Sequence, residues 1–203
     1  MVNSQYNQTL KPSRPRHGLA RFPGVDRARD RVSTTLVKTL TDQLSTYAAY
    51  HRDRRNIALH LIGIPLIFAS IEILLSRPAF AVGGLGLTPA ALLSLLAALF
   101  YLALDLRLGL VMALVLGTGA WLGTAVAAFP TPTWLATGIS MFVVGWIVQL
   151  VGHAHEGRKP AFLDDLVGLL IGPLFVVAEI GFRLGLRRDL EEAIERRAGR
   201  KAG

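Results

Sequence analysis

The sequence contains no cysteine among its 203 residues. This absence excludes disulfides, thiolate metal sites, iron–sulfur clusters and cysteine nucleophiles. Charged residues are also scarce, at 18%, whereas 52% of the residues are hydrophobic and the mean hydropathy is +0.44. Such a composition disfavours a water-soluble domain and favours a membrane protein. Any metal must be held by histidine, carboxylate or amide groups.

The first 24 residues lack the apolar core of a secretory signal peptide, so we expect insertion to begin at the first apolar span. Residues 1–55 hold 11 Lys/Arg against 4 acidic residues, 56–182 hold 4 against 6, and 183–203 hold 7 against 4. The net charge of +8 therefore comes from the ends of the chain, where the positive-inside bias and anionic lipids account for it. Because no groove-reading motif accompanies the charge, we predict no nucleic-acid partner.

Three regions follow from this pattern. Residues 1–32, rich in Pro, Arg, Ser and Asn without a sustained period, are expected to be a mobile basic arm. Residues 33–182 are predicted to be a membrane-embedded helical domain, and residues 183–203 a basic C-terminal tail. The second region opens with an amphipathic surface helix over residues 33–55, whose single stripe carries Leu36, Leu40, Leu44, Tyr47 and His51.

Four apolar spans are predicted over about residues 56–75, 89–104, 108–129 and 134–151. A fifth apolar stretch, residues 162–182, is interrupted at Gly172-Pro173, and we expect it to re-enter the membrane or lie in the interface, although a complete crossing stays open. The fold class is thus all-α, a polytopic bundle of four to five membrane segments. The positive-inside rule then places both tails in the cytoplasm, in a bacterial inner membrane.

Ionisable groups at the membrane edge are the most informative feature, because such positions are costly. With four crossings, His51 precedes the first span on the side where His153 follows the fourth. His51 and His60 are nine residues apart, about 180° on one helix, so both face one site only if the chain bends over residues 52–55. His153 and His155 diverge by about 200° on a helix, so only one of them is expected to point inward.

Three imidazoles with a nearby carboxylate and no thiol suit Fe(II) or Zn(II) before copper(I). No H-E-x-x-H motif is present, and five histidines are fewer than the roughly eight of membrane di-iron desaturases. The limit is therefore a site for one metal. Asp164 and Asp165 either cap the next helix or orient a metal-bound imidazole.

Two segments resemble the motifs of a known family. Tyr47–Pro65, YAAYHRDRRNIALHLIGIP, contains H-x4-N-x3-H followed by G-I-P. Gln149–Glu179 contains Q-x2-G-H, then E-G-x-K-P-A, then a GPLF run. Both are similar to the 2-hydroxy fatty acid dioxygenase family, small membrane proteins that include a fungal enzyme of alpha-oxidation.

The resemblance implies an Fe(II)-dependent dioxygenase that uses O2 to shorten a 2-hydroxy fatty acid by one carbon. It implies that His51, His60 and His153 bind the iron, with Asn56 and Glu156 as supporting groups, Glu156 at the reaction centre and Asn56 near the substrate. His155 has no counterpart in the fungal pattern and stays a further candidate. Arg158 or Lys159 would hold the substrate carboxylate at the interface, or else contact lipid headgroups.

Two other functions remain open from the residues alone. A membrane scaffold or small transporter would use the histidines in structural or proton-relay hydrogen bonds. A zinc-dependent membrane hydrolase would share the ligands but use a metal-bound water. A homodimer is also considered, and the GxxxG-like spacing of Gly119 and Gly123 indicates a close helix contact.

Overall fold

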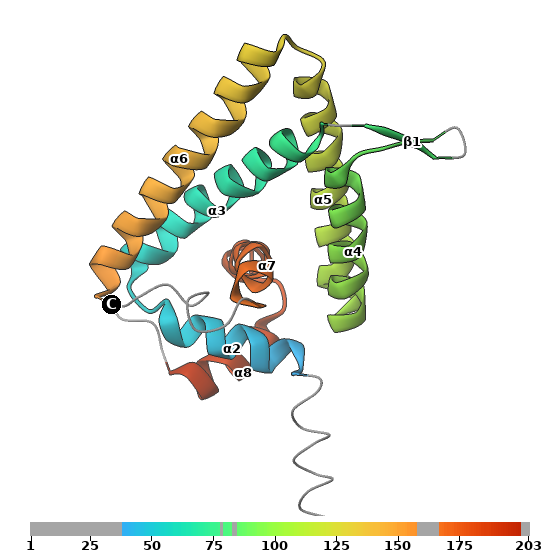
Figure 1. Cartoon of the computed structure of the whole chain (residues 1–203). Coiled ribbons are helices and arrows are strands. Elements are labelled where there is room, and N and C mark those ends of the chain that lie inside the picture. Colours follow the sequence, from blue (N-terminus) through green and yellow to red (C-terminus); the bar gives the residue numbers. More distant parts are fainter. Residues whose placement is uncertain (1–37, 78, 83–84, 158–166, 200–203) are drawn as a thin grey trace, which may run out of the picture. The chain divides into compact units, whose positions relative to one another are not determined.

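The computed structural model describes residues 38–77, 79–82, 85–157 and 167–199, so the arm expected over residues 1–32 lies outside the described residues. The described elements are α2 (Leu40–Tyr50), α3 (Arg54–Leu75), β1 (Phe80–Val82), β2 (Leu85–Leu87), α4 (Pro89–Leu104), α5 (Leu106–Ala127), α6 (Thr131–Glu156), α7 (Val167–Arg183) and α8 (Arg188–Ala198) (Figure 1). The predicted all-α class is confirmed. The glycine-rich segment after the first span adds a small antiparallel hairpin, β1–β2, which the sequence analysis did not predict.

Three of the helices, α3, α5 and α6, are long and apolar enough to cross a membrane. At about 1.5 Å per residue, a helix of 22 residues reaches about 33 Å, slightly more than the hydrocarbon core of about 30 Å. The α4 helix is apolar but has 16 residues, and α7 with α8 passes the same test only as one broken span bent by 117°. Each of the four predicted spans thus corresponds to an apolar helix.

Two helix pairs organise the bundle, with α3 packed along α6 and α4 packed along α5 (Figure 1). Glycines lie where α3 meets α6. A Cβ atom on Gly63 would lie 3.0 Å from the carbonyl oxygen of Gly145, and one on Gly145 would lie 3.0 Å from the backbone nitrogen of Ile67. Small residues let helix backbones approach closely in membranes. This contact sets the separation of the side chains that α3 and α6 direct toward each other.

The chain bends between α2 and α3. Such a bend is required if His51 and His60, about 180° apart on one continuous helix, are to face the same site. α2 ends before His51, whose φ of −129° and ψ of 83° are not helical. α3 begins at Arg54 and is capped by Asp53, whose side chain accepts a hydrogen bond of 2.7 Å from the backbone nitrogen of Arg55. The bend predicted over residues 52–55 therefore begins one residue earlier, which leaves His51 outside both helices.

The α7 helix continues through Gly172–Pro173, so the interruption predicted there is wrong. Proline removes one backbone hydrogen bond, but neighbouring helices can satisfy carbonyl groups near such a position. Here the Tyr101 hydroxyl of α4 donates a hydrogen bond of 2.7 Å to the carbonyl oxygen of Leu170, one turn before the proline. α7 therefore passes through the proline as one helix, and it is joined to α4 close to this position.

A further helix, α8, occupies most of the segment expected to be a basic tail. The chain turns between α7 and α8, where Gly185 and Arg187 have φ of 75° and 52°. α8 then packs against α2 and buries Leu190 and Ile194, and Arg197 pairs with Asp42 of α2. The apolar stripe of the amphipathic helix α2 consequently lies against α7 and α8, and the two ends of the described chain lie together.

Candidate metal centre

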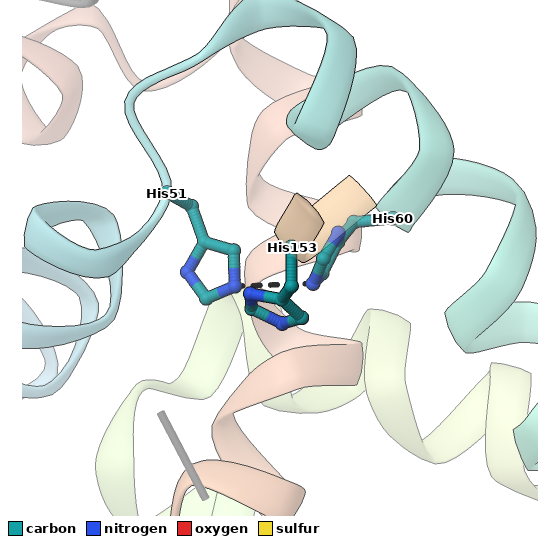
Figure 2. A group of neighbouring side chains, drawn as sticks. All are labelled: His51, His60 and His153. Atoms are coloured by element: carbon teal, nitrogen blue, oxygen red, sulfur yellow. Dashed lines mark hydrogen bonds between the residues drawn. The ribbon is translucent and has the colours of Figure 1, made fainter. Parts of the chain in front are cut away.

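Three histidines from separate parts of the chain converge (Figure 2). His51 comes from the bend after α2, His60 from the second turn of α3, and His153 from the last turn of α6. One ring nitrogen of each lies within 4.8 Å of the others. Their side chains are 2%, 2% and 8% exposed, respectively. The three imidazoles therefore form one buried cluster.

Backbone carbonyl groups fix the tautomers of two of these rings. Nδ1 of His51 lies 2.8 Å from the carbonyl oxygen of Tyr47, and Nδ1 of His60 lies 2.9 Å from that of Asn56. Because a carbonyl oxygen only accepts, each Nδ1 carries the proton and each Nε2 presents a lone pair in the neutral ring. The two Nε2 atoms are 3.1 Å apart. Two facing lone pairs repel unless a cation lies between them.

The His51–His60 pair has the spacing of two nitrogens bound to one metal ion. Two nitrogens bound to one metal at about 2.0–2.1 Å, with an angle between about 90° and 109°, lie about 2.9–3.4 Å apart. The Nε2–Nε2 distance of 3.1 Å falls in that range. Burial lowers the pKa of His51 to about 4, so its imidazole is neutral and available as a ligand near pH 7.

Glu156 ties the end of α6 to the bend that carries His51. Its carboxylate accepts hydrogen bonds of 3.0, 3.0 and 2.9 Å from the backbone nitrogens of Arg52 and Asp53, and one of 3.0 Å from the side-chain amide of Asn56. Both oxygens are therefore engaged with α3 and the bend. The structure places Glu156 as a clamp that positions His51 relative to α6, beside the histidine cluster.

Asn56 joins the same network from α3. It is fully buried, its carbonyl oxygen faces His60 Nδ1, and its amide nitrogen donates to Glu156. It is not among the described residues that line the cavity next to the cluster. His155 is exposed, so of the two neighbouring histidines only His153 points inward, as predicted. The candidates Arg158, Lys159, Asp164 and Asp165 lie outside the described residues.

An apolar cavity of about 450 Å³ extends from the cluster into the bundle. On each of two helices, α3 and α6, the residues that line the cavity form one stripe along the helix. On α3 these residues are His60, Ile64, Ile67, Phe68, Ile71 and Glu72, and on α6 they are Phe142, Trp146, Gln149 and His153. From His60 to Glu72 the α3 stripe runs roughly 18 Å at 1.5 Å per residue. The histidines thus occupy one end of a long, mainly apolar cavity, and Glu72 lies at the other end of the α3 stripe.

Comparison with known proteins identifies the family. The model described as 2-hydroxy-palmitic acid dioxygenase Mpo1-like matches residues 37–184. The 2-hydroxy-palmitic acid dioxygenase MPO1 of Saccharomyces cerevisiae is 34% identical over 158 residues, which cover 77% of this chain and 87% of the yeast protein. The chain belongs to the Mpo1-like dioxygenase family. No solved structure matches it.

The match to the Mpo1-like family covers the histidine cluster, the clamp at Glu156 and the cavity-lining residues of α3 and α6. α8 lies beyond the matched residues. The resemblance predicted from the two motifs is therefore confirmed. Two residues inside those motifs were given no role in the site by sequence reasoning. They are Tyr47, four residues before His51, and Gln149, four residues before His153. The four-residue helical spacing was the signal that could have placed them beside the cluster.

Tyr47 supports His51 from α2. Its ring stacks on the imidazole with ring centroids 4.2 Å apart and planes inclined by 10°, and it also contacts Phe175 of α7 at 5.0 Å. Burial raises the pKa of Tyr47, so the phenol stays protonated. The backbone carbonyl oxygen and the ring of Tyr47 thus both orient the imidazole of His51.

In this Mpo1-like chain, replacing Gly152 with alanine is expected to disrupt the metal centre. A Cβ atom there would lie 2.5 Å from Asn56 Oδ1 and 3.3 Å from His60 Nδ1, so either the Asn56 amide or α6 must move. Such overpacking typically costs about 1–3 kcal/mol. We expect metal affinity to fall roughly 10–100-fold, as for other changes next to ligands. Thermal unfolding and metal titration measure the two effects.

The matched control is Gly117→Ala in α5, where a Cβ atom would meet nothing within 4 Å. Alanine favours a helix over glycine by up to about 1 kcal/mol, so this variant should keep its metal affinity and its stability. Equal metal binding by the two variants would contradict the close fit of α6 against Asn56 and His60.

Proposed function

We propose that the protein is an Fe(II)-dependent dioxygenase that shortens 2-hydroxy fatty acids by one carbon. The observation that carries this proposal is the placement of three buried imidazoles at the end of a long apolar cavity, in a chain of the Mpo1-like dioxygenase family. The overall reaction of a 2-hydroxy acid with one O2 gives the shorter acid, CO2 and water, which balances all atoms.

The chain's own residues bind the ion and the acyl chain. His51, His60 and His153 would hold the iron, which supplies the redox chemistry with O2 that side chains lack. The carbonyl groups facing His51 and His60 orient the two rings, so that each Nε2 is available to the ion. The cavity stripe of roughly 18 Å suits an acyl chain, because one leaflet of a bilayer core about 30 Å thick is roughly 15 Å deep.

Product analysis tests the function. Purified protein loaded anaerobically with Fe(II) should convert 2-hydroxyhexadecanoate to pentadecanoate only when O2 is admitted, with one O2 consumed per product. Loading with Zn(II) provides the comparison, because three histidine nitrogens also suit zinc. Pentadecanoate formed with zinc and without O2 would contradict the dioxygenase, as would the absence of product with Fe(II) and O2.

We propose that the protein lies in a bacterial inner membrane with both tails in the cytoplasm. Support comes from the packing of α8 against α2, which keeps the two ends of the described chain on one side. Arg187 after α7 pairs with Asp105, between α4 and α5, at 3.2 Å, and Leu170 near the start of α7 contacts Tyr101 of α4. Both ends of α7 thus meet the same end of α4, which favours a segment that lies in the interface.

A homodimer stays a prediction, and the glycine spacing used for it has another role. A Cβ atom on Gly119 would lie 2.8 Å from the Phe68 ring, and one on Gly123 would lie 2.6 Å from Ser76 Oγ. The close helix contact indicated by Gly119 and Gly123 therefore occurs within the chain, between α5 and α3.

Filling the cavity should shift the preferred chain length. Ala97 lines the cavity on α4, one turn from Ser94, whose hydroxyl donates to Glu72 at 2.6 Å. We expect Ala97→Phe to lower activity on 2-hydroxyhexadecanoate at least tenfold relative to 2-hydroxydecanoate, because the longer chain no longer fits. The control Leu99→Phe changes a side chain that is 55% exposed outside the cavity. A similar ratio in both variants would place the acyl chain elsewhere.

A further inference from the structure

Gln149 is the one amide side chain among the described residues that line the cavity. It lies on α6 one turn before His153, on the stripe that also carries Trp146. Its side chain is 7% exposed. It therefore lies within the cavity wall, one helical turn from the histidine cluster.

The position of this amide is fixed by a glycine of α3. A Cβ atom on Gly63 would lie 3.1 Å from Gln149 Cγ and 3.3 Å from its Cδ. Gly63 itself is three residues after His60, on the neighbouring turn of α3. The side chain of Gln149 thus occupies space that the glycine leaves open, and the amide is held near the histidine end of the cavity.

The amide oxygen has no hydrogen-bond partner among the described residues. Oε1 of Gln149 is buried, and no described donor lies within hydrogen-bond distance. A buried acceptor without a partner destabilises a protein, and an apolar side chain of similar shape would avoid that cost. An acceptor kept in this place is suited to a donor that arrives with a ligand.

We propose that Gln149 is a specificity-determining residue for the 2-hydroxyl group of the substrate. This inference rests on the proposed function. The amide turns Oε1 toward the cavity when the ligand enters, and the hydroxyl donates its hydrogen to this oxygen while the acyl chain extends along the α3 stripe away from the histidines. A site built to hydrogen-bond a hydroxyl rejects an analogue that lacks it, because its own polar group is then left unpaired. Gln149 thereby selects 2-hydroxy acids over ordinary fatty acids, which a membrane contains in excess.

Binding measurements on the iron-loaded protein without O2 test this role without turnover. Trp146 lines the cavity, so its fluorescence reports occupancy. The ligands are 2-hydroxyhexadecanoate, 2-methoxyhexadecanoate, which keeps the oxygen but cannot donate, and hexadecanoate. The wild type should bind the hydroxy acid most tightly. Gln149→Leu should weaken binding of the hydroxy acid roughly tenfold and change that of the other two less than twofold.

Two further variants make the result specific. Phe142→Leu, at the other end of the α6 stripe, should weaken all three acids by a similar factor because it contacts only the chain. Gln149→Met provides a second apolar replacement, and an iron content equal to that of the wild type shows that the site is intact.

Two outcomes separate this inference from the proposed function. If Gln149→Leu and Gln149→Met keep the wild-type preference for the hydroxy acid, the role of Gln149 is overturned while the dioxygenase stands. If the wild type binds the three acids equally and shows no turnover, the proposed function fails and this inference fails with it.

Discussion

Replacing His60 with alanine should abolish metal-dependent stabilisation and reduce dioxygenase activity more than a hundredfold. Changes to groups that only support a ligand cost about 10–100-fold, so loss of a ligand should exceed that range. His60 is 2% exposed and its Nε2 lies 3.1 Å from that of His51, so its ring forms part of the buried histidine cluster. The activity is measured as pentadecanoate formed from 2-hydroxyhexadecanoate.

Thermal unfolding separates this effect from general damage. A metal that binds only the folded wild type stabilises it by about 2.7 kcal/mol when the free metal is a hundred times its Kd. We expect no such gain for His60→Ala. Without metal the variant should lose little stability beyond the removed ring, because the repulsion between two facing lone pairs is gone as well.

The control is His155→Ala, because His155 is exposed on the last turn of α6, two residues from the cluster. This variant should keep the metal-dependent increase in stability. If His155→Ala and His60→Ala lose the metal-dependent increase in stability to the same extent, the histidine cluster is not the metal site.

Replacing Glu156 with glutamine is expected to have the second largest effect. The carboxylate accepts from two backbone nitrogens of the bend and from the Asn56 amide. Glutamine must turn its NH2 group toward at least one of these donors. Hydrogen bonds to charged groups contribute about 1.5–3 kcal/mol each, so we expect the free energy of unfolding to fall by about 3 kcal/mol. Chemical denaturation measures this change.

Metal affinity should fall with it, roughly 10–100-fold, because the bend carries His51 and Glu156 holds the bend against α6. The matched control is Glu192→Gln on α8, whose side chain is 70% exposed beside Arg196. An exposed pair of this kind contributes about 0–1 kcal/mol. If Glu156→Gln binds metal as tightly as Glu192→Gln does, the clamp does not position the site.

Much of the site could be predicted from the sequence because helical geometry limits where side chains point. The separation of His51 and His60 by nine residues required a bend, and the bend is present. The divergence of His153 and His155 allowed one inward histidine, and His153 is the buried one. Long apolar runs predicted the membrane helices, because backbone N–H and C=O groups in lipid must form their hydrogen bonds within a helix.

Other features depend on contacts between distant segments, which a single sequence does not specify. One such contact is the hydrogen bond from Tyr101 of α4 to α7, which is continuous through Pro173. α8 was assigned to a tail because of its charge, although Leu190 and Ile194 at a spacing of four already indicated one apolar face. The unpaired oxygen of Gln149 follows from the approach of Gly63, about 90 residues earlier in the chain.

The most direct test of the account is the metal content of the protein purified anaerobically in detergent, measured by elemental analysis beside a His153→Ala variant. The account predicts about one iron per chain in the wild type and almost none in the variant, because it assigns the ion to all three imidazoles. Stoichiometric zinc in place of iron, or equal metal content in the two proteins, would contradict it.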